Sequence, residues 1–246
     1  MARKSGSRQL KRAPAPAFWP IHRKDATWAP MTRPGPHARN RSLPLVLVAR
    51  EILGFARTSK EAIRIVSSAR VKVDHAVRKD HRFPVGLMDV IQIEGMNQAY
   101  RVLPKGGSGL ALSPIQQTEV GFKLCKIVGK RTIRKGLVQI NLHDGRNLLL
   151  NKDDQRGEEE FEVGSSIQLV LPSQRIAKYI PFREGSIGLV TDGKNQGLYG
   201  KITSIIPGSY ARPSMVRVET AGEAFETPAH YVIPVGMDIS LVTLDR

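Results

Sequence analysis

The side chains best suited to chemistry in this sequence are clustered cations. Arg57, Lys60 and Arg64 are spaced three and four residues apart, so a helix would present them on one face. Lys and Arg in such a cluster supply the positive charge and the hydrogen-bond donors that hold phosphate groups. The pattern therefore indicates non-covalent recognition of a polyanion.

Residues that could support covalent or metal chemistry are sparse. Cys125 is the single cysteine, which excludes an intrachain disulfide and a cysteine-based zinc site. Cys125 could be a nucleophile with His143 as its base, but its apolar surroundings over residues 122–127 favour a small buried residue. The six histidines have no paired helical spacing. We therefore expect no catalytic residue, no metal, no cofactor and no small-molecule substrate.

A phosphate-binding loop around Gly200 and Lys201 is the one motif that resembles a nucleotide site. It lacks the required residues, because Asn195 replaces the first glycine and Ile202 replaces the Ser or Thr that would hold magnesium. Nucleotide hydrolysis is therefore not expected.

The charge balance points to a polyanionic partner. Lys and Arg number 38 against 22 Asp and Glu, which gives a net charge of +16, and 41% of the residues are hydrophobic, enough for folded cores. An anionic membrane is the alternative partner, but no apolar run approaches the roughly 18 residues of a spanning helix, and no amphipathic helix is evident. The polar start of the chain and prolines 14, 16 and 20 argue against a secretory signal or a presequence helix, so a cytoplasmic location is expected.

Residues 1–42 are expected to form an extended basic arm. Residues 1–41 contain ten Lys or Arg and one acid, Asp25, and too few apolar residues to fold alone. Such an arm suits threading between RNA helices, with cations on phosphates and rings stacked on bases. Docking of the two tryptophans on the protein's own surface is the alternative. The candidate RNA contacts of the arm are Arg3, Lys4, Arg8, Lys11, Arg12, Trp19, Arg23, Lys24, Trp28, Arg33, Arg39 and Arg41.

The elements that would position the first cation cluster lie in residues 43–95. A helix is predicted from Pro44 to Gly54, and a second begins at Thr58, whose hydroxyl and Glu61 form a capping box. A strand at 71–73, a turn at 74–75, a returning strand at 76–78 and a further strand at 87–93 follow.

From residue 96 the pattern is strands and turns. A hairpin is predicted across residues 136–150, with its turn at Asp144 and Gly145, and another strand runs over 166–172. The acidic residues 153–160 between them are interpreted as a solvated loop facing away from RNA. The last third alternates glycines with short β-branched runs, which favours a small barrel.

Residues 43–95 resemble the helical RNA-binding domain of bacterial small-subunit ribosomal protein four. The resemblance rests on Thr58-Ser59-Lys60-Glu61-Ala62 and on Val71-Lys72-Val73-Asp74, although His75 stands where the family has Gly. It implies that the second helix and the hairpin present cations to RNA. The residues placed there are Arg57, Ser59, Lys60, Arg64, Lys72, Arg78 and Lys79.

Residues 184–210 resemble a KOW motif, an element of SH3-like barrels in ribosomal proteins and transcription factors. Gly197 matches the characteristic glycine, where the backbone turns tightly and can approach a phosphate, and Lys194 and Lys201 flank it. These three residues complete the candidate RNA contacts.

The order of these modules resembles the archaeal and eukaryotic "e" type of small-subunit ribosomal protein four. Family-like strings include Trp19-Pro20-Ile21, residues 83–91 and residues 227–232, and the length suits an archaeal member. The resemblance implies a structural constituent of the small ribosomal subunit that binds its large RNA and neighbouring ribosomal proteins, in single copy and as a monomer when free. The expected fold is α+β and multidomain: a basic arm (1–42), a helix-turn-helix-like RNA-binding domain (43–95), a central β-domain (96–177) and a KOW-containing SH3-like barrel (178–246).

Two other functions fit parts of the sequence. An RNA-modifying enzyme accessory would explain the helical domain, but the string Gly145-Arg146-Asn147-Leu148 lacks the catalytic Asp of pseudouridine synthases, and no βαβ rhythm follows. A KOW-containing transcription or translation factor would explain the last third but not the arm and the helical domain.

Overall fold

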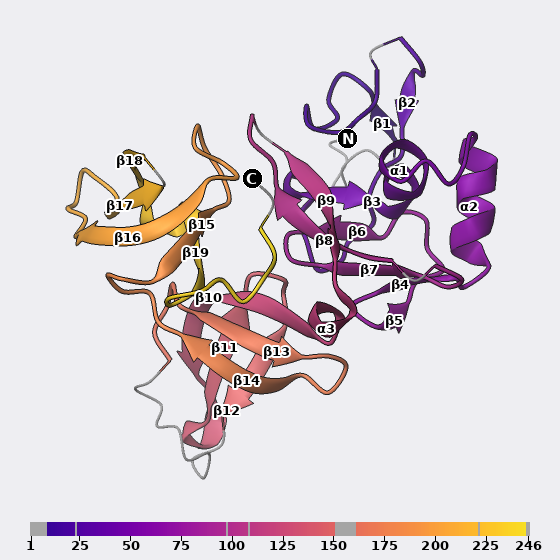
Figure 1. Cartoon of the computed structure of the whole chain (residues 1–246). Coiled ribbons are helices and arrows are strands. Elements are labelled where there is room, and N and C mark those ends of the chain that lie inside the picture. The colour runs from indigo at the N-terminus through magenta and orange to yellow at the C-terminus, as the bar shows by residue number, and fades with distance from the viewer. Residues whose placement is uncertain are drawn as a thin grey trace, which may run out of the picture.

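Three antiparallel sheets of five strands each form most of the molecule. A computed structural model of the chain describes residues 9–22, 24–96, 98–107, 109–150, 161–220 and 222–244. In Figure 1 the first sheet lies beside the helices, the middle sheet lies below it, and the C-terminal sheet lies on the opposite side. The fold is α+β, mostly β, with three lobes.

The N-terminal arm folds back onto the first lobe. Its strands β1 (Leu10–Lys11) and β2 (Trp28–Ala29) pair antiparallel. Trp19 is 2% exposed, and its indole N–H donates to the Ser42 carbonyl at 2.8 Å. The prediction of an extended arm is therefore wrong for the described part of residues 9–42. The apolar residues of the arm, too few for a core of their own, join the core of the next segment.

The predicted helices are present, with one change of type. After η1 (Arg39–Arg41) and β3 (Ser42–Pro44), the helix expected from Pro44 begins as α1 (Leu45–Leu47) and continues as the π-helical turn η2 (Val48–Ile52). The second helix is α2 (Ser59–Ser67).

The capping box at the start of α2 is confirmed. The Glu61 backbone N–H donates to the Thr58 hydroxyl at 3.3 Å, and the Glu61 carboxylate accepts from the Thr58 backbone N–H at 3.2 Å. Ala62 and Val66 are fully buried on the inner face, which leaves the opposite face of α2 to solvent.

The first sheet extends past residue 95. Its strand order is β5-β4-β7-β8-β9, while β6 pairs with β3, and β8 and β9 follow residue 95. The expected domain boundary there therefore lies between hydrogen-bonded strands. The predicted strand at 87–93 is shorter, because Met88 has a φ of +65°. The strands are β4 (Val71–Val73), β5 (Ala76–Val77), β6 (Pro84–Gly86), β7 (Val90–Ile93), β8 (Ala99–Pro104) and β9 (Leu110–Ile115).

The middle sheet is built around one long strand, β10 (Phe122–Thr132), in the order β12-β11-β10-β13-β14. The predicted hairpin is confirmed as β11 and β12, and the boundary expected at residue 177 falls inside β14. The acidic residues 153–160 lie outside the described residues. The remaining elements are α3 (Gln117–Val120), η3 (Arg134–Gly136), β11 (Val138–Leu142), β12 (Asn147–Leu150), β13 (Ser166–Val170) and β14 (Arg175–Ile180).

The C-terminal sheet has the order β18-β17-β16-β15-β19, so the last strand returns beside the first. Its chain then runs back toward α3, where the Thr243 backbone N–H donates to the Glu119 carboxylate at 3.2 Å. The elements are β15 (Ile187–Val190), β16 (Tyr199–Ile206), β17 (Met215–Thr220), β18 (Glu223–Pro228), η5 (Ala229–Tyr231) and β19 (Val232–Gly236).

An apolar core joins the three lobes where they meet. It receives buried side chains from the first, middle and C-terminal sheets and from the C-terminal tail, so the lobes share one desolvated surface. Its buried members are Met88, Leu103, Leu124, Ile180, Leu189, Ile233, Val235 and Val242.

Gly197 seals the contact between the C-terminal lobe and the β8–β9 loop. It has a φ of +86°, and a Cβ at this position would lie 2.9 Å from the Gly106 amide nitrogen and 3.2 Å from the Pro104 carbonyl oxygen. The neighbouring Gln196 amide donates to the Gly109 carbonyl at 2.8 Å. The sequence predicted that the backbone at Gly197 approaches another group closely. In the structure that group is the backbone of the β8–β9 loop.

We predict that Gly197→Ala destabilises the chain more than Gly185→Ala does. Both glycines have a left-handed φ, but a Cβ at Gly185 meets no atom within 4 Å. Gly185→Ala should cost about 1–2 kcal/mol from backbone strain alone, and Gly197→Ala about 1–3 kcal/mol more from the clash. Urea unfolding of the two variants measures the difference; equal losses would contradict the proposed contact.

Candidate functional site

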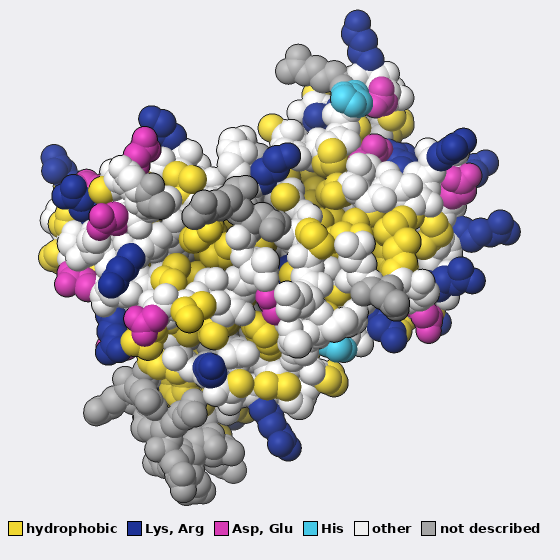
Figure 2. All heavy atoms as spheres, viewed as in Figure 1, with side chains coloured by type: hydrophobic (Ala, Val, Ile, Leu, Met, Phe, Trp, Pro, Cys, Tyr) yellow, Lys and Arg dark blue, Asp and Glu magenta, His cyan; other side chains and the backbone are white. Residues whose placement is uncertain are grey.

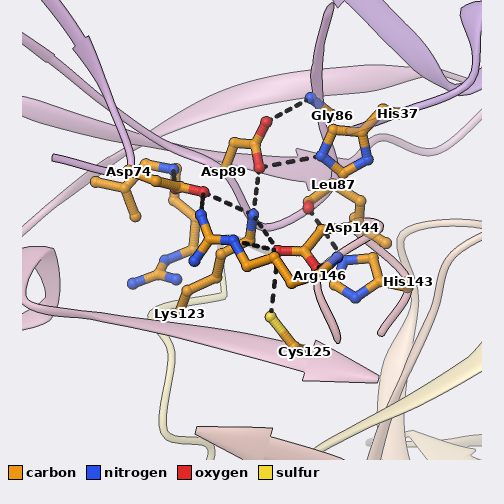
Figure 3. Close-up of polar contacts among 12 residues, drawn as sticks. His37, Asp74, Gly86, Leu87, Asp89, Lys123, Cys125, His143, Asp144 and Arg146 are labelled. Atoms are coloured by element: carbon orange, nitrogen blue, oxygen red, sulfur yellow. Dashed lines mark hydrogen bonds and ion pairs between the residues drawn. The ribbon is translucent and has the colours of Figure 1, made fainter. Parts of the chain in front are cut away.

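One group of side chains able to do chemistry is buried where the first and middle sheets meet. Lys123, on β10, is 1% exposed at its side chain, and its ammonium contacts the carboxylates of Asp74 at 2.8 Å and Asp144 at 3.1 Å, as well as that of Asp89. Arg146 pairs with Asp74 at 2.7 Å and with Asp144 at 3.2 Å. Figure 3 shows the three carboxylates converging on the lysine.

Local backbone structure holds these carboxylates in place. Asp74 lies in the β4–β5 turn with a φ of +51° and accepts from the Val90 backbone N–H at 3.0 Å. Asp89 accepts from the Gly86 backbone N–H at 2.9 Å, and Asp144 lies in the β11–β12 turn. Each acid therefore belongs to a tight connection whose conformation depends on it.

The charges of the cluster stabilise one another. Burial opposes the charge of Lys123, but the Asp89 and Asp74 carboxylates outweigh it and raise the lysine's pKa. Burial would likewise raise the pKa of Asp89, yet Lys123 and His37 hold it well below its usual range. The pKa of Asp144 is also lowered, with Lys123 the strongest influence against burial. All three side chains are charged at neutral pH.

Histidines and the cysteine border the cluster without forming a catalytic pair. His37 Nε2 lies 3.1 Å from the Asp89 carboxylate, and His143 Nδ1 accepts from the Lys126 backbone N–H at 3.1 Å. The Cys125 thiol is fully buried and donates to Asp144 at 3.6 Å, and burial raises its pKa well above the ordinary value. The interpretation of Cys125 as a small buried residue is confirmed. Since its thiol stays protonated and sealed from solvent, it lacks what a nucleophile needs.

A second buried lysine connects β10 to the C-terminal lobe. Lys126 donates to the carbonyls of His230 at 2.9 Å and Val232 at 2.6 Å, and more weakly to that of Ala229 at 3.4 Å. Burial lowers the pKa of Lys126 to about 8. Lys123 and Lys126 thus tie the middle sheet to both of its neighbours.

We predict that Lys123→Met destabilises the chain by about 3–5 kcal/mol, because it removes the ammonium from three buried carboxylates and leaves Asp74 and Asp144 with only Arg146. The matched variant Lys178→Met removes an exposed lysine from β14 and should change the free energy of unfolding by less than about 0.5 kcal/mol. Chemical unfolding of both proteins measures this. Our account of the cluster fails if Lys123→Met stays within about 1 kcal/mol of the native chain.

We predict that stability rises with pH between about 4 and 6.5. Burial and the nearby Lys123 lower the pKa of His143 to about 4 from its ordinary 6.5. Between these values the unfolded chain binds more protons than the folded chain, so the free energy of unfolding increases with pH, by about 1–2 kcal/mol for this half-buried group. Asp89 and Asp144 add a further loss of stability as the pH falls below the ordinary aspartate value.

Unfolding midpoints of the native chain and of His143→Gln from pH 4.5 to 6.5 test this. The variant should have a flatter dependence on pH, whereas replacing the exposed His22 with Gln should leave the slope unchanged. A slope that His143→Gln does not reduce would assign the pH dependence to other groups.

The second group of candidate side chains is exposed on α2. Arg57, Lys60 and Arg64 are all solvent-exposed, as the spacing predicted, and no described carboxylate forms an ion pair with them. Glu61, between them in sequence, is occupied by the backbone N–H groups of Arg57 and Thr58. Figure 2 shows Lys and Arg projecting along the edge that carries α2, while both charge signs mix over the C-terminal sheet.

Several acids of the first lobe are engaged by other groups of the protein. Glu51 pairs with Arg50 at 2.6 Å, and Asp80 pairs with Arg33 at 3.0 Å. Asp74 and Asp89 are buried in the ionic cluster. The charged side chains that remain unpaired on the exposed side of α2 are therefore positive. We call the surface that carries the exposed cations Arg57, Lys60 and Arg64 the α2 face.

The other residues of the helical unit that were predicted to contact RNA are less exposed or are engaged by neighbouring side chains. Lys72 and Arg78 are half-buried, and the Arg78 guanidinium lies 4.4 Å from the centre of the Phe83 ring. Ser59 is exposed, but its hydroxyl accepts from Arg50. Ser59 and Arg78 are thus held by the neighbouring side chains Arg50 and Phe83.

The predicted arm residues divide into three groups. Lys11, Lys24, Trp28, Arg33, Arg39 and Arg41 are exposed. Trp19 is buried and Arg12 is half-buried, with its Nε donating to the Ile21 carbonyl at 2.8 Å. Arg3, Lys4, Arg8 and Arg23 lie outside the described residues.

The two tryptophans have opposite environments. The expectation that Trp19 stacks on a base is wrong, because its ring is buried in the core of the first lobe. For Trp19 the alternative, docking on the protein's own surface, is what the structure has. Trp28 is 53% exposed, and the Lys11 ammonium lies 5.8 Å from its ring centre. Of the two tryptophans, Trp28 is the one whose ring is available for stacking.

The KOW-like residues are also divided. Lys194 and Lys201 are exposed, and Lys201 lies across from Glu219 in the β16–β17 pairing. Gly197 approaches the β8–β9 loop, so it holds the two lobes together and its backbone is not free to meet a phosphate. Arg41 reaches the same region through an ion pair with Asp192 at 3.3 Å.

Sequence reasoning missed three exposed side chains. Arg70, just before β4, and Lys105, beside the Gly197 contact, extend the positive surface. Tyr210 is fully exposed at the tip of the β16–β17 hairpin, where Ser209 and Arg212 exchange backbone hydrogen bonds. The Pro-Gly and Arg-Pro pairs on either side of Tyr210 predict a turn. An aromatic residue in such a turn could have indicated an exposed ring.

Within the described residues, no helix is long and apolar enough to cross a membrane. The described part of the chain also holds no group of three acidic, histidine or cysteine side chains suited to a metal ion. At the ionic cluster, the ammonium of Lys123 occupies the centre where a cation would be held.

Comparisons with known proteins agree on one family. A family model described as Ribosomal family S4e matches residues 96–176, and one described as the RS4NT (NUC023) domain matches residues 4–40. The small ribosomal subunit protein eS4 of Methanothermobacter thermautotrophicus is 44% identical over 245 residues, covering 99% of this chain and 98% of the relative. That of Ignicoccus hospitalis is 43% identical over 243 residues, covering 97% and 95%.

A solved structure has the same fold. The crystal structure of the 30S ribosomal protein S4e from Thermoplasma acidophilum aligns with a TM-score of 0.67 and 27% sequence identity. The alignment covers 80% of this chain and 95% of that chain.

Proposed function

The chain belongs to the ribosomal family S4e, and from this premise we infer that it is a structural constituent of the small ribosomal subunit. Its place is the cytoplasmic ribosome of an archaeal cell, where it contacts ribosomal RNA and other ribosomal proteins. The family is structural, and its role in translation is to support the fold of the subunit's RNA.

We propose that this chain binds RNA mainly through the α2 face. Its cations are exposed, and the acids around them are occupied by backbone N–H groups, by arginines or by the buried cluster. Phosphate contacts of this kind give affinity without sequence information, while the shape of the RNA selects the site. We place Arg57, Lys60, Arg64 and Lys79 on RNA phosphates, with Lys72, Arg78 and Ser59 at the edge of the contact.

The arm and the C-terminal lobe extend this interface. We propose that Lys11, Trp28, Lys24 and Arg39 contact RNA from the folded arm, and that Lys194 and Lys201 contact it from the C-terminal lobe. Residues 43–95 correspond in this proposal to the helix-turn-helix-like RNA-binding unit, and the sheet of β15 to β19 to a KOW-type SH3-like barrel. We further propose one copy per subunit and a monomer when free; the burial of a shared apolar core within one chain supports the monomer.

No catalytic role is part of the proposal. The titratable residues that lie close together, Lys123, Cys125 and the three aspartates, are buried and satisfied by one another. A transient KOW-containing factor would use the C-terminal lobe alone and would leave the α2 face without a purpose.

We predict that changing Arg57, Lys60 and Arg64 together to Glu weakens binding of the whole chain to purified small-subunit RNA by about 10–100-fold at moderate salt. Loss of up to three phosphate contacts should also reduce the slope of log affinity against log salt by about 2–3. Filter binding or fluorescence anisotropy across a salt series measures both quantities.

The matched control changes Arg175, Lys178 and Arg217, three exposed cations away from α2, to Glu, with the same change of net charge. If this control weakens binding as much as the α2 variant does, the interface is not on α2. Gradient sedimentation of native extract adds a second readout: a structural constituent stays on the small subunit at moderate salt near one copy each, whereas a transient factor is found mostly free.

A further inference from the structure

An open hollow of about 510 Å³ lies between the folded arm and the η1 turn. One wall is the arm segment with Pro14, Pro16, Ala17 and Phe18, and the other is formed by Arg39 and Asn40. None of the residues that line the hollow belongs to the ionic cluster or to α2. Its volume is in the range of sites that hold small organic groups.

Both walls are fixed by contacts of the described residues. The Trp19 indole N–H bonds to the Ser42 carbonyl, so the residue that follows Phe18 is tied to the strand that follows η1. The Trp19 backbone N–H donates to the Pro16 carbonyl at 3.2 Å, which closes the arm wall into a turn. Phe18 also packs against the first-lobe core. The hollow is therefore formed before any ligand arrives.

The lining chemistry matches a nucleobase. Phe18, half-buried, and the two prolines offer apolar surface to the face of a planar ring. The exposed Asn40 amide has a donor and an acceptor side by side, as the edge of a base requires. The exposed Arg39 guanidinium can hold the adjoining phosphate. The residues that line the hollow include no carboxylate.

We propose that this hollow receives one unpaired base of the small-subunit RNA, with Asn40 on the base edge, Phe18 along its face and Arg39 on its phosphate. The proposal rests on the proposed function, since it names a subsite within the RNA interface. The apolar surface beside an exposed guanidinium favours a nucleotide, because an acidic side chain would leave Phe18 and the prolines uncovered and a neutral side chain would leave Arg39 unpaired. The arm thus recognises an unstacked nucleotide, in contrast to the α2 face, which contacts backbone phosphates.

The test is base-specific chemical probing of purified small-subunit RNA bound to the whole chain. Dimethyl sulfate and a carbodiimide together modify the Watson–Crick edges of all four bases when these are unpaired. With the native chain, one unpaired base should be protected. With Asn40→Ala or Phe18→Leu, the reactivity of that base should return by about fivefold or more, while the other protected positions stay protected.

Matched controls separate the hollow from general effects on folding. Asn147→Ala removes the same amide from exposed β12, and Phe225→Leu makes the same apolar change in the half-buried part of the C-terminal sheet. Both should leave the base protected. A footprint that Asn40→Ala and Phe18→Leu leave unchanged overturns the base-binding hollow and leaves the ribosomal role intact; a native chain without any footprint would overturn the proposed function itself.

Discussion

One buried ammonium fixes how the first and middle sheets of this protein pack together. The Lys123 ammonium forms ion pairs with three aspartates that come from separate turns, and Arg146 pairs with two of the same carboxylates. Such a cluster gains little free energy over an apolar replacement, but any one of its charges left alone would be costly. The arrangement that satisfies all of them is therefore strongly favoured over any other packing of the first and middle sheets.

The internal use of acids shapes the outer surface. A chain with net charge +16 still carries 22 acidic residues, and several of those in the first lobe are buried or occupied by the backbone. Arg57, Lys60 and Arg64 on the α2 face consequently have no ion-pair partner among the described residues. The same side chains that order the interior thus leave a positive exterior. This is a physical link between the ionic junction and the capacity to bind a polyanion.

Local features were predictable from the sequence, and long-range ones were not. The Thr58–Glu61 capping box, the exposed face of α2 and the 136–150 hairpin depend on neighbouring residues, so spacing and turn chemistry sufficed. Trp19 and Gly197 were misjudged because their partners, Ser42 and the β8–β9 loop, lie 23 and about 90 residues away. The boundary expected at residue 95 lies between β7 and β8, which pair as neighbouring strands, and no signal in the sequence indicated this pairing.

The folding of the arm onto the first lobe has a consequence for synthesis of the chain. Residues 9–42 are made before the helices and strands that bury Trp19, Leu10 and Ile21, which follow over residues 43–115. Until those have been made, the arm is an unfolded cationic peptide with exposed apolar side chains, in a cell rich in RNA. The arm therefore docks correctly only if the rest of the first lobe is translated before the arm binds other RNA, or if a chaperone covers the arm during that time.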